Sequence, residues 1–314
     1  MTRPRLYAGL TRRLASPKVG DLDADALFIC SSSGTEARAR AAIWDEIFVT
    51  KPDQCVEVVA STESHVSFRR GRLTLEIALN DDNALMEVLS ARRAAYVDIS
   101  GLPHHVWAPL IRAGFRAVDT LYATYTEPDS YRRHPSPTSR TEFDLSEGFR
   151  GVEPLPGFAK LRGPDDETEA VLVTLLGFEG NRARHVALAL DPVPPVYAIV
   201  GVPGFRIEYP QVTFAANEDF IGEYRAHASI RMARASCPFE AFDSLSEVHR
   251  DSGGGYMYIA PVGTKPHALG AICYALKQPT NTEIMYDNPL RKSGRTDGVR
   301  IFHIYRLKPS HVAP

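Results

Sequence analysis

The sequence predicts an α/β protein made of two Rossmann-like domains with mainly parallel sheets. Three observations indicate this fold class: short apolar runs alternate with helical patterns, a proline-rich stretch interrupts them near the middle, and the two halves share motifs in the same order. The length of 314 residues agrees with two domains, since a domain has roughly 150 residues.

The first half alternates strands and helices from residue 26 onward. A continuous apolar run predicts a buried strand over 26–31, and apolar residues at helical spacing predict a helix over 35–48. Pro103 occupies the first turn of another predicted helix, where its missing N–H costs nothing. The same patterns predict strands over 56–60, 73–78, 95–99 and 117–124 and helices over 83–93 and 103–113.

Prolines break this alternation in the middle of the chain. The stretch from 127 to 164 predicts a connection that packs on the surface, and it contains Pro128, Pro135, Pro137, Pro154, Pro156 and Pro164. We therefore expect a Rossmann-like half over 1–135, a connection over 136–164 and a second Rossmann-like half over 165–314.

In the second half the alternation begins again. Apolar runs predict strands over 170–176, 196–200, 256–260, 283–286 and 300–307. Helical spacing predicts helices over 181–190, 217–229, 239–249 and 266–277. The stretch 192–210, with its prolines and glycines, is expected to form a rigid wall beside the second strand.

Three motifs recur in the same order in the two halves. Residues 26–42 align without gaps on 170–186, which places Arg38 opposite Arg182. Gly101-Leu-Pro-His104 resembles Gly263-Thr-Lys-Pro-His267, and Tyr125-Thr-Glu-Pro128 resembles Tyr286-Asp-Asn-Pro289. Each pair follows a predicted strand, which indicates a diverged internal duplication. The alternative is that ordinary strand–helix loops reuse the same turn residues.

These motifs lie where open parallel sheets bind ligands, beyond the carboxyl ends of the strands. Helices that begin there present unpaired N–H groups, which suit phosphate. The candidate ligand-binding residues are Ser32, Ser33, Arg38, Glu179, Arg182, Gly263, Thr264 and Lys265. The structural alternatives are helix capping by the serines, an ordinary helix start with an exposed lysine at Lys265, and arginines that face solvent or pair with acids.

Four carboxylates near the same loops are candidates for a general base, namely Glu36, Glu127, Glu179 and Asp287. Tyr125 and Tyr286 could contact a base or ribose, or simply belong to a strand exit. Neither an HxH nor an HExxH spacing supports a metal, and the Walker A order is missing, so ATP hydrolysis has little support and no cofactor is expected.

The strand, Gly263-Thr264-Lys265 and helix over 259–275 resemble the signature of CARF- and SAVED-type sensor domains. Residues 171–182 also resemble the first strand and loop of such a domain. The resemblance covers the second half and implies a Rossmann-like fold, binding of cyclic oligonucleotides and a role in prokaryotic antiviral signalling, in paired modules or homo-oligomers.

We therefore expect a nucleotide-binding or phosphorylated-ligand-binding sensor or accessory protein in antiviral defence, with a separate effector protein as partner. A near-neutral chain favours a small anionic ligand, although a local basic strip over 291–300 leaves DNA or RNA open. The alternatives are a nucleotide-processing hydrolase or transferase, and a structural subunit of a defence complex without its own ligand.

Composition indicates the setting of this protein. With 44% hydrophobic and 24% charged residues the chain is neither disordered nor a coiled coil. Four cysteines without a CxxC pair argue against a disulfide framework and are typical of a reducing compartment. No apolar stretch of the sequence is long enough to cross a bilayer, so we expect a cytoplasmic protein without a membrane partner.

Overall fold

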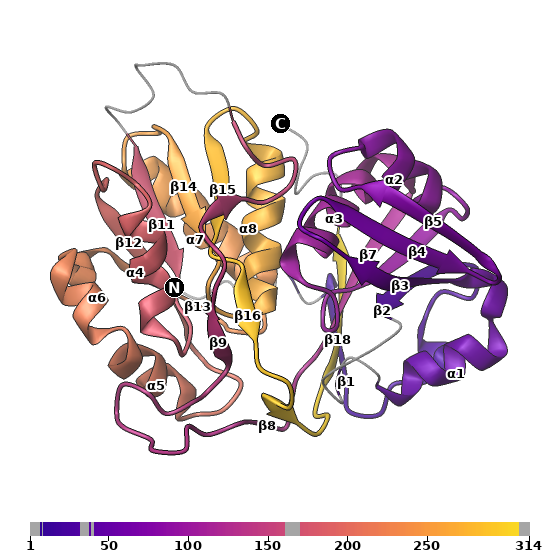
Figure 1. Cartoon of the computed structure of the whole chain (residues 1–314), viewed down its shortest axis with the longest axis horizontal. Helices are drawn as coiled ribbons and strands as arrows, with labels where there is room; N and C mark the ends of the chain where they lie inside the picture. The colour runs from indigo at the N-terminus through magenta and orange to yellow at the C-terminus, as the bar shows by residue number, and fades with distance from the viewer. Residues whose placement is uncertain (1–6, 8, 32–37, 39–40, 161–169, 308–314) are drawn as a thin grey trace. The chain divides into compact units, whose positions relative to one another are not determined.

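The computed structural model describes residues 7, 9–31, 38, 41–160 and 170–307, which form two compact units (Figure 1). Of the described residues, unit 1 contains those up to 131 together with 296–307, and unit 2 contains those from 132 to 295. Both units combine helices with a large sheet, which confirms the α/β class. Within the described ranges, no helix is both long and apolar enough to cross a membrane.

Unit 1 is built on an eight-stranded sheet in the order β1-β18-β7-β6-β2-β3-β4-β5. The four central strands β7, β6, β2 and β3 run parallel, whereas β18, β4 and their outer neighbours pair antiparallel. The strands are β1 (Thr11–Leu14), β2 (Leu27–Ser31), β3 (Cys55–Ser61), β4 (His65–Arg70), β5 (Leu73–Ala78), β6 (Ala94–Asp98), β7 (Thr120–Thr126) and β18 (Phe302–Leu307).

The two middle strands of unit 1, β2 and β6, are buried on both faces, as is typical of strands inside a parallel sheet. Every residue of β2 and β6 is buried, as their continuous apolar runs predict. The helices are α1 (Ala42–Thr50), α2 (Asp82–Leu89) and α3 (His104–Ala117). Helix α2 begins where the Asp81 carboxylate accepts a hydrogen bond from the backbone N–H of Ala84 at 3.0 Å.

Unit 2 is built on a six-stranded sheet in the order β10-β15-β14-β11-β12-β13, parallel except for the edge strand β10. The strands are β10 (Glu153–Pro154), β11 (Val171–Leu175), β12 (Val196–Gly201), β13 (Ile230–Ala233), β14 (Met257–Ala260) and β15 (Thr282–Tyr286). Two short antiparallel pairs complete the strands: β9 (Ser146–Phe149) with β16 (Pro289–Arg291) in unit 2, and β8 (Ser130–Tyr131) with β17 (Thr296–Asp297) in unit 1.

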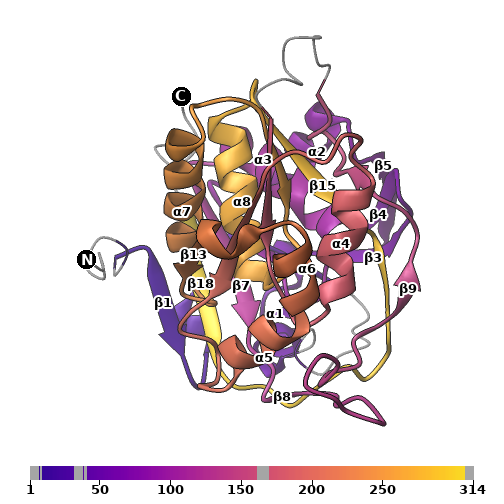
Figure 2. The same ribbon diagram turned by 90° about the vertical axis from the view of Figure 1, so that its left-hand side faces the viewer.

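Helices cover both faces of the unit 2 sheet. Helix α4 (Gly180–Leu188) lies on one side, with α7 (Pro238–Asp251) and α8 (Lys265–Lys277) on the other (Figure 2). The connection from β11 to β12 and the connection from β14 to β15 run in opposite directions across the sheet. Because such connections are right-handed, their helices α4 and α8 lie on opposite faces. Helices α5 (Tyr209–Ala216) and α6 (Glu218–Glu223) connect β12 to β13.

The two sheets share a strand order. In unit 1 the central order is β7-β6-β2-β3, and in unit 2 the matching order is β15-β14-β11-β12. The recurring sequence motifs occupy matching strands: the first motif begins at β2 and β11, the glycine motif follows β6 and β14, and the tyrosine motif ends β7 and β15.

Several elements differ from those predicted. The helix over 217–229 is interrupted, because Arg225 adopts a left-handed conformation (φ 52°) between α6 and a 3₁₀ helix over Ala226–Ser229. Helix α5 begins within the stretch 192–210 that was expected to form a wall, and α5, β1, β4 and β13 were not predicted. Of the helix predicted over 35–48, only its end is described, within α1; residues 35–37, 39 and 40 lie outside the described residues.

The compact units also differ from the expected residue ranges. Strand β18, assigned from sequence to the second half, pairs with β7 in unit 1. Phe302 and Ile304 of this strand join the core that contains Phe28 and Trp44. The proline-rich connection expected over 136–164 belongs to unit 2 in its described part, where β9 pairs with β16.

Candidate functional site

Arg182 lies at the carboxyl edge of the unit 2 sheet and forms a bidentate ion pair with Asp287. Its Nε donates to Oδ2 at 2.8 Å and its Nη2 to Oδ1 at 2.6 Å, and Nη1 donates to the carbonyl oxygen of Val262 at 3.0 Å. Asp287 directly follows β15 and is fully buried, and the guanidinium carbon lies 5.6 Å from the Tyr286 ring centroid. Arg182 is therefore paired with an acid, which is one of the structural alternatives that the sequence left open.

The ion pair keeps Arg182 charged although the residue is buried. Burial by itself lowers the pKa of the guanidinium, but the hydrogen bonds and the negative charge of Asp287 outweigh it, and the pKa of Arg182 is raised above its ordinary value. Glu179 adds a smaller contribution in the same direction. The side chain of Asp287 therefore already supplies the countercharge that an anionic ligand would provide.

Gly263 is required by the packing of two strand-exit loops. A Cβ atom on Gly263 would lie 2.4 Å from the carbonyl oxygen of Leu176, and one on Gly177 would lie 2.8 Å from that of Val262. The loops that follow β11 and β14 thus touch backbone to backbone. This contact accounts for the glycine without a ligand.

Thr264 is the N-cap of helix α8. Its hydroxyl accepts a hydrogen bond from the backbone N–H of His267 at 3.3 Å and donates to the carbonyl oxygen of Ala235 at 2.8 Å. Lys265 is the first residue of the helix and is only 6% exposed. The motif therefore begins a helix, as its structural interpretation predicts, but Lys265 is buried and not exposed as that interpretation expected.

His267 follows in the first turn of α8 and is completely buried. Its Nε2 lies 3.1 Å from the carbonyl oxygen of Arg234, to which it donates as the neutral imidazole. Burial lowers the pKa of His267 to about 4, against smaller opposing contributions from hydrogen bonds to backbone carbonyls of Arg234 and Ala233. This histidine is uncharged at neutral pH.

The segment before β10 covers the loop that follows β11. The Ser146 hydroxyl donates to the carboxylate of Glu179 at 3.0 Å, and the rings of Phe143 and Phe178 lie 4.7 Å apart. Asn217, which the sequence did not single out, donates its amide to the carbonyl oxygen of Gly177 at 2.7 Å. The unit 2 loop is therefore packed by side chains of its own unit.

Arg38 lies at the matching place in unit 1 and is 4% exposed. Its Nη1 donates to the phenol oxygen of Tyr125 at 3.0 Å and to the carbonyl oxygen of Thr126 at 3.5 Å. The guanidinium carbon is 5.6 Å from the Tyr125 ring centroid, the same separation as that of Arg182 from Tyr286. Both units thus place an arginine against the tyrosine that ends the matching strand.

Glu127 and His303 form a second buried pair beside Arg38. The Nε2 of His303 lies 2.7 Å from Oε1 of Glu127, and both residues are at most 2% exposed. His303 lies opposite Tyr125 in the register between β18 and β7, and their ring centroids are 6.2 Å apart. Burial, the largest cause, raises the pKa of the Tyr125 phenol well above its usual value, and the positive charge of Arg38 lowers it only in part.

The third buried group of unit 1 follows β6. The Asp98 carboxylate accepts hydrogen bonds from the backbone N–H and the hydroxyl of Ser100, at 3.1 and 2.8 Å. The Ser100 hydroxyl in turn accepts from the backbone N–H of Thr126 at 2.8 Å. The exits of β6 and β7 are therefore joined by polar contacts next to Arg38.

The candidate residues that the structure describes fall into one group in each unit. Arg182, Asp287, Gly263, Thr264, Lys265 and Glu179 lie at the edge of unit 2, whereas Arg38 and Glu127 lie at the edge of unit 1. Ser32, Ser33 and Glu36 lie outside the described residues. Sequence reasoning missed His303, Asp98 and Ser100; the Asp-x-Ser spacing at a strand end was a local signal for the last two.

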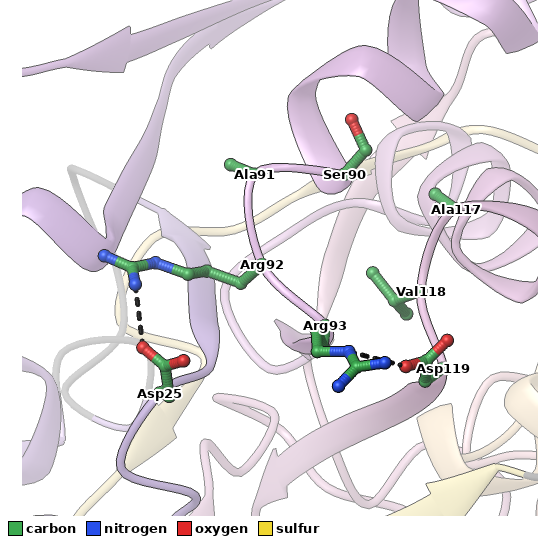
Figure 3. Close-up of a pocket in the computed structure, with 8 residues that line it drawn as sticks. All are labelled: Asp25, Ser90, Ala91, Arg92, Arg93, Ala117, Val118 and Asp119. Atoms are coloured by element: carbon green, nitrogen blue, oxygen red, sulfur yellow. Dashed lines mark hydrogen bonds and ion pairs between the residues drawn. The ribbon is translucent and has the colours of Figure 1, made fainter.

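A cavity of about 400 Å³ opens at the opposite, amino edge of the unit 1 sheet (Figure 3). Two arginines reach across it to carboxylates: Arg92 to Asp25 at 2.7 Å and Arg93 to Asp119 at 3.1 Å. The Arg93–Asp119 pair is exposed, and Arg92 is half-buried against an exposed carboxylate; ion pairs of this kind contribute little to stability. We therefore place the candidate site at the carboxyl edge.

Neither a family model nor a curated protein matches this sequence. Among the residues that the structure describes, no cluster of three or more histidine, cysteine, aspartate or glutamate side chains could hold a metal ion.

Proposed function

We propose that this chain binds a nucleotide or another phosphorylated ligand at the carboxyl edge of the unit 1 sheet, with Arg38 as the residue that contacts the phosphate. The difference between the two matching strand ends carries this proposal. The residue that matches Asp287 in unit 1 is Thr126, which carries no charge. Unit 2 thus has an acidic residue built into the fold at a position where unit 1 has a neutral one.

The guanidinium of Arg38 is buried at the carboxyl end of β7, where its Nη1 donates to the Tyr125 phenol oxygen and to the Thr126 carbonyl oxygen. Arginine forms bidentate hydrogen bonds with phosphate, and Tyr125 holds its guanidinium from one side. A bound phosphate would supply negative charge at the place that Asp287 occupies in unit 2.

The matching strand orders and the two arginine–tyrosine pairs support a diverged internal duplication as the origin of the units. In this proposal unit 1 retains the ligand site, and unit 2 has replaced the ligand by an ion pair. The protein would act as a cytoplasmic sensor or accessory component with a separate effector protein. The resemblance of residues 259–275 suggests antiviral signalling as the setting.

Native mass spectrometry of the full chain against inorganic phosphate, mononucleotides and cyclic oligonucleotides tests the proposal. We expect at least one phosphorylated compound to bind, and Arg38→Gln to weaken that binding by roughly 10- to 100-fold, as expected for a charge-assisted hydrogen bond. Arg92→Gln, an arginine at the opposite edge of the same sheet, is the matched control and should bind as the wild type does. Absence of binding by every compound, or undiminished binding by Arg38→Gln, would contradict the proposal.

The Glu127–His303 pair favours a second candidate, a nucleotide-processing hydrolase or transferase. A carboxylate that orients an imidazole is a common arrangement for general base catalysis, and the His303 ring centroid lies 6.2 Å from that of Tyr125, which Arg38 contacts. Analysis of the same samples for altered nucleotides separates the two functions. Turnover that is abolished by Glu127→Gln but not by Arg92→Gln would favour the enzyme.

A further inference from the structure

A separate groove lies on one face of the unit 1 sheet. Its volume is about 360 Å³, within the range of small-ligand sites, and residues of β1, β6, β7 and β18 contribute to its walls. Its charged and aromatic side chains are Arg12, Asp21, Asp23, Tyr96, Tyr122 and Arg306. Tyr122 lies near the beginning of β7, whereas Tyr125 and Thr126, which contact Arg38, lie at its end.

Four side chains form a row across the sheet on this face. In the strand register Phe28 is opposite Tyr96, Tyr96 is opposite Tyr122, and Tyr122 is opposite Arg306. Directly opposed residues on neighbouring strands project from the same face. The row therefore consists of three aromatic rings followed by one cation.

The three rings are stacked in sequence. The centroids of Phe28 and Tyr96 are 5.4 Å apart with an interplanar angle of 19°, and those of Tyr96 and Tyr122 are 4.4 Å apart with an angle of 9°. The backbone N–H of Asp23 donates to the Tyr96 hydroxyl at 3.1 Å, which holds the middle ring in place. Tyr122 is thus supported on one face by a fixed stack.

The other face of Tyr122 is turned toward β18, the next strand in the sheet. Tyr122 is half-buried and lines the groove, and Arg306 beyond it is exposed. Within the described part of the chain, the guanidinium of Arg306 makes no hydrogen bond, ion pair or ring contact. The stack therefore ends at Tyr122, which lines the groove beside a cation on the neighbouring strand.

We propose that this groove binds a planar heteroaromatic ring of the nucleobase class, stacked on Tyr122 and covered by Arg306. Bases stack on aromatic side chains irrespective of their sequence identity, and arginine stacks on planar rings. The walls carry Arg12 and Arg306 together with Asp21 and Asp23, so their charges balance. This balance favours a ring with both hydrogen-bond donors and acceptors over a bare anion such as phosphate.

The proposal goes beyond the phosphate site at Arg38 and rests on different residues. A nucleoside, which has a base but no phosphate, is the probe that separates the two. The full chain is titrated separately with adenosine, guanosine, cytidine and uridine, and binding is monitored by ligand-observed NMR. We expect at least one of these nucleosides to bind. Arg38→Gln should bind that nucleoside as the wild type does, whatever its effect on phosphorylated ligands.

Tyr122→Ala should weaken nucleoside binding by about tenfold or more, because the stacking platform is lost. Tyr122→Phe keeps the ring and should retain binding. Tyr197→Ala is the matched control, since Tyr197 is also a half-buried tyrosine on a strand, in unit 2. Arg306→Gln changes an exposed side chain, so it tests the covering cation in a variant whose fold is not at risk, and we expect it to weaken binding severalfold.

Three results would overturn the proposal. The first is that no nucleoside binds at millimolar concentration. The second is that Tyr122→Ala and Arg306→Gln both bind as the wild type does. The third is that Tyr197→Ala loses as much affinity as Tyr122→Ala, which would show that binding does not depend on this groove.

Discussion

Arg182 and Asp287 form a bidentate ion pair in which the carboxylate is completely buried, with donor–acceptor distances of 2.8 and 2.6 Å. The two residues are 105 positions apart in the sequence, so the pair ties the first turn of α4 to the end of β15. Its geometry sets apart the two otherwise similar strand-edge sites. In unit 2 the carboxylate of Asp287 compensates the positive charge of Arg182.

Breaking this pair should strongly destabilise unit 2. Asp287→Asn leaves the Arg182 guanidinium buried without its countercharge, and we expect a loss of about 3–5 kcal/mol in the free energy of unfolding. Denaturant unfolding followed by circular dichroism measures it. Arg140→Gln, which removes an exposed pair with Glu218 and Asp219, should cost at most about 1 kcal/mol. Equal losses for both variants would show that burial of the Arg182 pair has no special weight.

A carboxylate in unit 1 at the position that matches Asp287 should prevent phosphate from binding at the proposed site. Thr126→Asp places a carboxylate at the position that matches Asp287, beside Arg38, and should abolish binding of the phosphorylated ligand found with the wild type. Thr126→Asn has a similar size without the charge and should retain more of the affinity. Isothermal titration calorimetry of both variants measures the difference. Tighter binding by Thr126→Asp would contradict the assignment of Arg38.

Gly263 should be needed for folding even without a ligand. In Gly263→Ala the new Cβ would lie 2.4 Å from the carbonyl oxygen of Leu176, so one of the two loops must shift, at a cost of about 1–3 kcal/mol. Thermal unfolding in the absence of any ligand checks this. Gly20→Ala is the control, since no atom lies within 4 Å of its new Cβ, and its melting temperature should stay close to that of the wild type.

Acid should destabilise unit 2 through His267. Its pKa is about 4 in the folded protein, against 6.5 for an unperturbed histidine, so between these values the unfolded chain binds more protons. The contribution of His267 is complete above pH 6.5 and is lost as the pH falls toward 4, by an amount on the order of 3 kcal/mol. Unfolding free energies measured from pH 4 to pH 7 should depend less steeply on pH in His267→Gln. A slope identical to that of the wild type would argue against a buried neutral histidine.

Local sequence patterns were sufficient for most secondary structure. The apolar runs at β2, β6 and β11 predict strands because a fully buried strand must be apolar on both faces. The start of α8 was also predicted, since Pro266 is a first-turn proline. These signals act over a few residues and depend little on the rest of the fold.

Three strands at or near the sheet edges, β1, β4 and β13, were not predicted. Strand β4 has a short, mixed pattern with arginines at its end, because it lies near an edge of the sheet and is only partly buried. A similar difficulty applies to β1 and β13, which are edge strands. Backbone hydrogen bonds to a neighbouring strand determine their position, and their side-chain pattern gives little indication of a strand.

By itself, the sequence determined the α/β class, the alternation of strands and helices, and the two arginines and tyrosines at matching places in the two halves. Only the tertiary structure decided that Arg182 meets Asp287, that His303 returns on β18 to pair with Glu127, and that the rings of Phe28, Tyr96 and Tyr122 stack. The physical reason is that capping and hydrophobic periodicity act between residues close in sequence. Ion pairs and stacked rings depend on which strands become neighbours, and here the partners of the two pairs are 105 and 176 residues apart.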